Sequence, residues 1–322
     1  MKLSFLFMGD KPDVRWSLVR QMGVKYAVAK LAPSLTGKEP IWNYEVLEQA
    51  KQTYARNGFE LVALEGDQFD MTRIKLGLPG REEDADHYCR MLENMGRLDI
   101  NTLCYNFMQT GWFRTKTDIP ERGGAFVTGY DSRDAALLPA RPYAPVSASK
   151  IWENYRWFIS RVMPAAESSG VKMGLHPDDP PVRSIEGVDR ILISPEAMEK
   201  ALSLSDSPSH GLTFCQGTYF TMGADTEGFF RKWKDRVVFI HLRDVEGSAE
   251  HFRETFHDNG PHDMARFIKL YADQGFDGLV RSDHVPTMAG EANDRPSYSM
   301  NGSLFGVGYI KGIMDAYKIK TV

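Results

Sequence analysis

The sequence has few cysteines, no long apolar run and no surplus of basic residues. Its three cysteines, Cys89, Cys104 and Cys215, are too few and too scattered for a disulfide framework. No stretch approaches the roughly 20 apolar residues of a membrane-spanning helix. The apolar run after Lys2 is interrupted at once by Gly9, so we expect a first β-strand there and no signal peptide. These features predict a cytoplasmic protein with no membrane partner.

The charge balance argues against nucleic-acid binding. The chain carries 39 Lys and Arg residues against 43 Asp and Glu residues, a formal net charge of −4. A protein that binds a phosphate backbone needs a basic face, and this balance does not favour one. A length of 322 residues, 42% of them hydrophobic, is enough for one large core of the size that a barrel enzyme requires. We therefore expect an enzyme that acts on a small molecule, and not a protein that binds nucleic acid.

Short apolar runs alternate with longer amphipathic stretches from one end of the chain to the other. The expected strands are residues 2–8, 26–31, 60–65, 100–107, 171–176, 211–215, 237–242 and 278–283. The expected helices include residues 42–58, 81–97, 150–169, 226–234 and 263–275. This alternation predicts an α/β fold, a (β/α)8 TIM barrel in which residues 1–322 form a single domain. An open, doubly wound sheet is the main alternative, although no Gly-x-Gly-x-x-Gly turn follows the first strand.

One segment does not fit the alternation. Residues at about 114–149 are rich in Pro, Gly and Ser and show no clear periodicity. The segment is too long for an ordinary connection between a barrel strand and its helix. We interpret it as a long loop insertion over the functional site.

Four consecutive expected strands end in, or run into, side chains that bind metals. These residues are His176, Cys215, His241 and Asp283. Barrel enzymes build their sites at the carboxyl ends of the strands, so a closed barrel would bring the four together. Two imidazoles, a thiolate and a carboxylate are a suitable ligand set for a divalent metal. Taken singly, each has a plainer interpretation, such as a buried apolar cysteine or a loop-capping aspartate.

Two further side chains near the last strand are candidates for proton transfer. His284 follows Asp283 directly, and histidine as a residue type exchanges protons near neutral pH. Tyr298 lies in the polar loop that leads into the last helix. Without further context, a packed loop aromatic is the plainer interpretation of Tyr298.

A series of motifs at these residues resembles the mannonate dehydratase family, in one order and over nearly the whole chain. The motifs are IKLGLPGR at 74–81, CYNFM at 104–108, HPDDPP at 176–181, FC with a glycine at 214–217, HLR at 241–243, FxExxHxxGxxDM at 252–264, RxDH at 281–284 and YS at 298–299. So many pieces in one order are more specific than any single motif.

The resemblance implies a xylose-isomerase-like barrel and a lyase activity. Such a hydro-lyase would dehydrate D-mannonate, or a closely related aldonic acid, to a 2-keto-3-deoxy sugar acid in hexuronate degradation. A homo-oligomer, either dimer or tetramer, is implied as well. The metal would be Mn2+ or Fe2+, with Co2+ or Zn2+ as alternatives because a thiolate is a soft ligand. The implied metal ligands are His176, Cys215, His241 and Asp283, the implied acid–base pair is His284 and Tyr298, and the candidates for substrate contact are Tyr105, Asn106, Asp178, Arg243, His257 and Arg281.

Some positions depart from the family pattern. Ser303 follows Gly302 where the family has arginine, and Val285 stands where the family has glycine after the Asp-His pair. Loss of an arginine removes a bidentate grip on a substrate carboxylate, which leaves the exact substrate open. The alternatives are a sugar or sugar-acid epimerase or isomerase that uses the same metal site, and a metal-bearing sugar-acid binder without catalysis.

Overall fold

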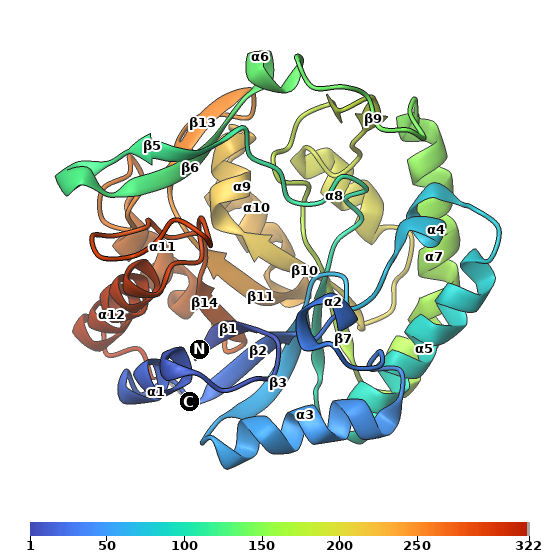
Figure 1. The fold of residues 1–322 in the computed structure, drawn as a ribbon, viewed down its shortest axis with the longest axis horizontal. Helices are drawn as coiled ribbons and strands as arrows, with labels where there is room; N and C mark the ends of the chain where they lie inside the picture. The colour runs from blue at the N-terminus through green and yellow to red at the C-terminus, as the bar shows by residue number, and fades with distance from the viewer. Residues whose placement is uncertain (321–322) are drawn as a thin grey trace.

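The computed structural model describes residues 1–320, and eight of their strands pair side by side to close a parallel barrel (Figure 1). Around the ring the order is β1-β14-β11-β10-β7-β4-β3-β2. Their bounds are β1 Lys2–Met8, β2 Tyr26–Lys30, β3 Glu60–Glu65, β4 Thr102–Tyr105, β7 Lys172–Leu175, β10 His210–Cys215, β11 Val237–Leu242 and β14 Leu279–Ser282. The predicted barrel is thus confirmed over the open sheet, and each strand overlaps its predicted range.

The strand register places the expected site residues at one depth. Cys215 lies beside His241 across the β10–β11 pair, and His241 lies beside Arg281 across the β11–β14 pair. Because all the barrel pairs are parallel, the carboxyl ends of these strands open onto the same end of the barrel.

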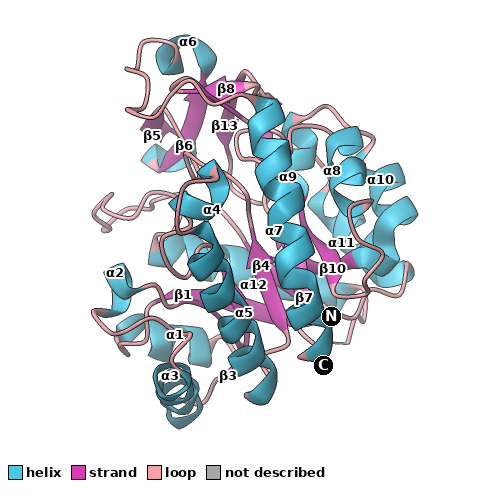
Figure 2. Cartoon of the chain, turned by 90° about the vertical axis from the view of Figure 1, so that its right-hand side faces the viewer, coloured by secondary structure: helices cyan, strands magenta, loops and turns pink. Residues whose placement is uncertain are grey.

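Helices surround the strands on the outside, with α5 and α7 packed together beyond β4 and β7 (Figure 2). Ser194 caps α8 (Pro195–Leu202), because its side chain accepts a hydrogen bond from the Ala197 N–H. The α-helices are α1 Val14–Gln21, α2 Pro33–Thr36, α3 Tyr44–Arg56, α4 Thr72–Leu76, α5 Arg81–Arg97, α6 Ser132–Ala135, α7 Ala148–Ser168, α8 Pro195–Leu202, α9 Gln216–Thr221, α10 Thr226–Trp233, α11 Met264–Asp273 and α12 Met300–Ala316. Two 3-10 helices, η1 Arg122–Gly124 and η2 Lys234–Arg236, complete the set. Within the described part of the chain, none of these helices combines the length and the apolar character needed to cross a bilayer.

The segment expected as a loop insertion contains regular structure. Strands β5 (Lys116–Pro120) and β6 (Phe126–Asp131) form an antiparallel hairpin. The hairpin pairs with β13 (His251–Glu254), which pairs with β12 (Val245–Ser248), and the result is a four-stranded sheet in the order β12-β13-β6-β5 (Figure 1). A much smaller pair, β8 (Ser184–Ile185) and β9 (Val188–Asp189), lies further along the chain.

Apolar side chains fill the middle of the barrel. Val28, Ala63, Cys104, Phe239 and Leu279 come from five different barrel strands and form one buried cluster. The cluster separates a cavity at the carboxyl ends of the strands from a depression at the amino ends. The charged side chains of the two hollows lie at opposite ends of the barrel, where water or a ligand can reach them.

Candidate active site

The predicted metal ligands meet at the carboxyl ends of the strands. Ligand atoms of His176, Cys215 and His241 all lie within 4.8 Å of one another. Asp283 Oδ2 lies 3.7 Å from Cys215 Sγ and 4.0 Å from His241 Nδ1. The four side chains follow or end β7, β10, β11 and β14, so the closed barrel brings together residues that are far apart in sequence.

The electrostatics of this group favour an ionised sulfur. Burial alone would raise the pKa of the Cys215 thiol, but Arg243 and His176 outweigh it and hold that pKa well below its ordinary value. Burial likewise acts to lower the pKa of His176, and the neighbouring Cys215 thiolate instead raises it to about 9. The pair therefore holds a proton between a thiolate and an imidazole, where a divalent cation would supply the positive charge in its place.

The fourth predicted ligand is also ionised. Burial acts to raise the pKa of Asp283, but the neighbouring His284 and the Arg281 guanidinium hold it well below the ordinary range. His241 turns Nδ1 toward Asp283 and Nε2 toward Glu65, whose oxygen lies 3.4 Å away. An ionised thiolate, an ionised carboxylate and imidazole nitrogens fit a divalent transition-metal ion.

A second group of ligand-type atoms overlaps the first. Glu65, Cys104 and His241 also have atoms within 4.8 Å of one another. Arg281 donates hydrogen bonds to both carboxylate oxygens of Glu65, at 2.6 and 3.0 Å. Burial raises the pKa of the Cys104 thiol well above its ordinary value, so the sulfur keeps its proton. This second group is better suited to supporting His241 than to holding an ion.

The proposed acid–base pair faces the same cavity as the ligands. This cavity, of about 180 Å³, is lined in part by His176, Asp283, His284 and Tyr298. The rings of His284 and Tyr298 meet edge to face, with centroids 5.5 Å apart. Trp112 adds a wall, since its ring lies 5.1 Å from that of His284 and 6.3 Å from that of Tyr298.

A buried carboxylate orients His284. Glu254 Oε1 accepts a hydrogen bond from His284 Nδ1 at 2.9 Å. Burial acts to raise the pKa of Glu254, but Arg243 and His284 lower it to about 2, so the carboxylate is ionised and can only accept. Arg114, also buried, holds the same carboxylate at 2.5 Å. His284 therefore carries its proton on Nδ1 and leaves Nε2 free for proton transfer.

Arg243 joins three carboxylates behind the cavity. Its guanidinium lies 3.0 Å from Asp179, 2.9 Å from Glu254 and 3.1 Å from Asp283. The arginine passes so close to Gly217 that a Cβ there would lie 2.7–2.9 Å from side-chain atoms of Arg243. A glycine is needed at that position because any side chain would displace the guanidinium.

Three other predicted substrate contacts lie away from the cavity lining, as Arg243 does. The Tyr105 hydroxyl is buried against the Tyr155 hydroxyl at 2.9 Å. Asp178 accepts hydrogen bonds from two backbone N–H groups of the following loop, at 2.9 and 2.8 Å. His257 Nε2 lies 2.8 Å from the carbonyl oxygen that ends β11. These positions suit side chains that support the site and do not touch a ligand.

The remaining two predicted contacts line the cavity, together with residues that sequence reasoning missed. Asn106 and Arg281 are part of the lining. Of the missed residues, Lys30 and Glu65 end strands β2 and β3, so the signal that indicated the metal ligands could have found them. Arg114, which holds Glu254 and lies outside the lining, comes from the insertion and had no such signal.

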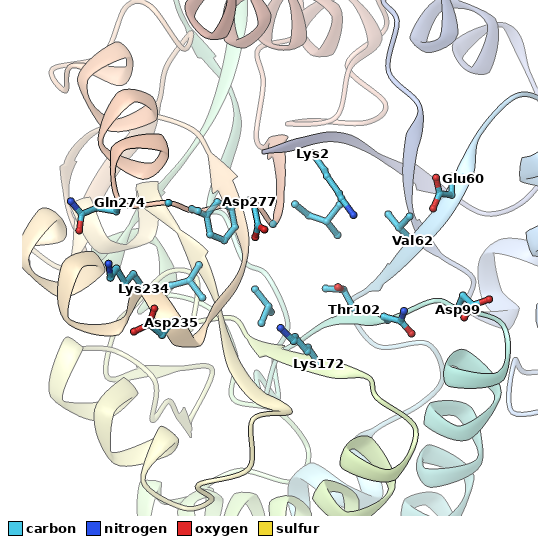
Figure 3. Close-up of a pocket in the computed structure, with 17 residues that line it drawn as sticks. Lys2, Glu60, Val62, Asp99, Thr102, Lys172, Lys234, Asp235, Gln274 and Asp277 are labelled. Atoms are coloured by element: carbon cyan, nitrogen blue, oxygen red, sulfur yellow. The ribbon is translucent and has the colours of Figure 1, made fainter. Parts of the chain in front are cut away.

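The opposite end of the barrel has a wider depression of about 420 Å³ (Figure 3). Figure 3 shows Lys2, Glu60 and Lys172 around it, the first residues of β1, β3 and β7. Neither ligand group found within residues 1–320 includes a residue of this depression. The chemistry therefore belongs to the carboxyl end.

Comparisons with known proteins agree with this geometry. The model of the family described as D-mannonate dehydratase (UxuA) matches residues 1–138 and 136–321. Mannonate dehydratase of Streptococcus uberis is 32% identical over 348 residues, which cover 98% of each chain. The corresponding protein of Thermotoga maritima is 31% identical over 360 residues, again 98% of each chain.

Solved structures give the same result. The crystal structure of mannonate dehydratase from Streptococcus suis serotype 2 superposes with a TM-score of 0.88 at 29% identity, over 98% of this chain and 96% of that one. A 3-keto-D-glucoside 4-epimerase from E. coli superposes with a TM-score of 0.63 at 11% identity, over 97% and 99%. The second match is evidence for the fold alone.

Proposed function

The chain belongs to the D-mannonate dehydratase family, and we propose from this premise that it is a hydro-lyase acting on D-mannonate or a closely related aldonic acid. The product would be a 2-keto-3-deoxy sugar acid. The observation that carries the proposal is one cavity lined by metal-ligand side chains and by His284 and Tyr298, within a chain that matches the family from end to end. The comparisons favour this activity over the epimerase alternative.

The ligands of a divalent ion would be His176, Cys215, His241 and Asp283, whose atoms converge as described. Mn2+ or Fe2+ is our proposal for the ion, with Co2+ or Zn2+ as alternatives that suit the thiolate. Such an ion, when bound, supplies a Lewis acid that stabilises negative charge developing on the substrate.

The acid and the base can be assigned from the two environments. Burial raises the pKa of the Tyr298 phenol well above its ordinary value, and the nearby Asp283 raises it further, so Tyr298 keeps its proton. His284 has its Nδ1 proton fixed on Glu254, which leaves Nε2 as an acceptor. We assign His284 as the base that takes the C2 proton and Tyr298 as the acid for the C3 hydroxyl.

The elimination then balances. His284 Nε2 takes the C2 proton, the C3–O bond breaks, and Tyr298 gives its proton to the departing hydroxyl, which leaves as water. The enol that remains becomes the 2-keto-3-deoxy acid when its C3 gains a proton and its C2 hydroxyl loses one. The proton held by His284 returns to the Tyr298 oxygen.

A direct assay tests the proposal. The protein is incubated with D-mannonate and Mn2+, Fe2+ or Co2+, and the product is examined for a 2-keto-3-deoxy acid. An epimerase would instead yield an aldonate of unchanged mass, and a non-catalytic binder would bind without turnover. Replacing His284 by Asn should abolish turnover and leave the metal content intact, and near-normal activity in H284N would refute the assigned role.

A homo-oligomer and a cytoplasmic location, both expected from the sequence, stay predictions. Light scattering in solution measures the first and cell fractionation the second.

A further inference from the structure

One cation in the active-site cavity has no counter-charge. Lys30 is the last residue of β2, and its side chain lines the same cavity as Asp283 and Tyr298. Among residues 1–320, its ammonium makes neither an ion pair within 4.0 Å nor a hydrogen bond. The Lys30 ammonium therefore has no ionic or hydrogen-bonding partner within the described part of the chain.

The carboxylates that line the cavity, by contrast, each have a cation within 4.0 Å. Glu65 is held by Arg281 at 2.6 Å, and Asp67 by Lys75 at 2.6 Å. The other pairs are Asp179 with Arg114 at 2.8 Å and Asp283 with Arg281 at 2.8 Å. Lys30 is therefore a cation of the lining whose ammonium is held by no carboxylate within 4.0 Å in the described chain.

The position of Lys30 is set by its strand. Its carbonyl oxygen accepts a hydrogen bond from the Gly9 N–H at 2.8 Å, which fixes the backbone at the end of β2. Its side chain passes Gly66, where an added Cβ would lie 3.7–3.8 Å from the last three atoms of the lysine chain. The side chain is half-buried, so its ammonium is partly withdrawn from water and interacts more strongly with an anion than a fully exposed lysine would.

We propose that Lys30 binds the carboxylate of the sugar acid and makes the site selective for acidic over neutral sugars. The inference deepens the proposed function and rests on it for the class of ligand. Removal of the C2 proton drives negative charge into the neighbouring carboxylate, so an ammonium at that group stabilises the transition state as well as the bound substrate. Lys30 would thus be a substrate-binding residue in addition to those the sequence motifs indicate.

Binding and turnover are measured on the Mn2+-loaded protein. D-mannonate, D-gluconate and the neutral D-mannitol are titrated by calorimetry into Tyr298→Phe protein with and without Lys30→Met. The loss of a charged hydrogen bond predicts that K30M weakens binding of both aldonates about 10- to 100-fold. The affinity for D-mannitol, which has no carboxylate, should change by less than about threefold in K30M. Lys30→Arg, which keeps the charge, should restore most of the affinity.

A matched control comes from the other end of the barrel. Lys172 begins β7 and lines the amino-end depression of Figure 3, so Lys172→Met removes a strand lysine that is remote from the cavity. K172M should bind the aldonates as the parent does. Lys30→Gln serves as a second uncharged variant, and thermal unfolding shows that each variant folds.

The outcomes separate this inference from the proposed function. Dehydration of D-mannonate by the wild type, with aldonate binding in K30M and K30Q unchanged, overturns the role of Lys30 and leaves the activity standing. Lys30-dependent binding of aldonates without any dehydration supports the inference and refutes the activity. Failure of the wild-type protein to bind either aldonate overturns the inference.

Discussion

Replacing Glu254 by Gln tests how the protein prepares His284 for proton transfer. In the wild type the carboxylate accepts from His284 Nδ1 at 2.9 Å and also pairs with Arg114 and Arg243. Oε1 accepts from both His284 Nδ1 and Arg114, whereas Oε2 contacts Arg243 alone. An amide oxygen at the Oε1 position would keep the proton on His284 Nδ1, but the negative charge that stabilises the protonated ring after proton transfer would be lost.

The expected loss follows from the role of His284 as the base. Without the charge of Glu254, His284 accepts the C2 proton less readily; complete loss of a general base costs about 10²- to 10⁴-fold in rate, and E254Q should show a part of it. We expect this loss in kcat, with KM and metal content close to the wild-type values. Removing one partner of a buried ion pair costs about 3–5 kcal/mol, and the retained amide oxygen should keep E254Q below that range.

The assay is steady-state dehydration of D-mannonate, well below the melting temperature of each variant, with the metal measured by elemental analysis. Glu121→Gln is the matched control. The side chain of Glu121 is buried and pairs with Arg253 at 3.2 Å. Arg253 precedes Glu254 on β13, so the two side chains point to opposite faces of the sheet. E121Q should lose stability without losing kcat.

Two results would refute this reasoning. One is a kcat for E254Q within about threefold of the wild type at full metal occupancy, less than the weakening of a base predicts. The other is a fall in activity that only parallels a loss of metal, which would mean that Glu254 supports the metal site and not the base His284.

Three further predictions concern the acid, the metal and the response to pH. Tyr298→Phe should lower kcat about 10²- to 10⁴-fold, with a metal content equal to that of the wild type by elemental analysis. Chelation should lower the melting temperature and added Mn2+ should restore it, whereas Cys215→Ala should lower the metal stoichiometry; an unchanged melting temperature after complete metal removal would contradict this. Burial acts to raise the pKa values of Glu65 and Glu254, but their cationic partners lower both to about 2. Both carboxylates therefore contribute stability that is present above about pH 4.5 and is lost as the pH falls toward 2, by about 1.4 kcal/mol per unit of pKa shift. Unfolding measured between these pH values should show the loss, and Glu65→Gln should make the slope shallower; an equal slope in E65Q would count against it.

The barrel and the convergence of the four candidate ligands could be predicted because both depend on local patterns. A strand that is buried on both faces reads as an apolar run, and Cys215 and Asp283 stand at the ends of such runs. A closed parallel barrel then leaves only one end at which these residues can meet. The geometry of the metal ligands therefore follows once the topology is known.

The hairpin of β5 and β6 could not be predicted in the same way. Its strands are short, and β6 is stabilised by pairing with β13, whose Phe252 lies opposite Tyr130 in the distant part of the chain. The same holds for Arg114, which reaches Glu254 only because the insertion folds back over the barrel. That Lys30 is free also lies beyond sequence reasoning, since it depends on where every neighbouring carboxylate finds its cation.

The close approach of Gly217 to Arg243 limits how the mouth of the barrel can be redesigned. An alanine at 217 would require a shorter residue at 243, and three acidic side chains would then repel one another without a common counter-ion. The two positions must consequently be varied together or left alone in any library that seeks new substrates. Diversity is better directed to Met8, an exposed residue of the cavity lining, than to Trp112, whose ring lies 4.9 Å from the Arg114 guanidinium of that network.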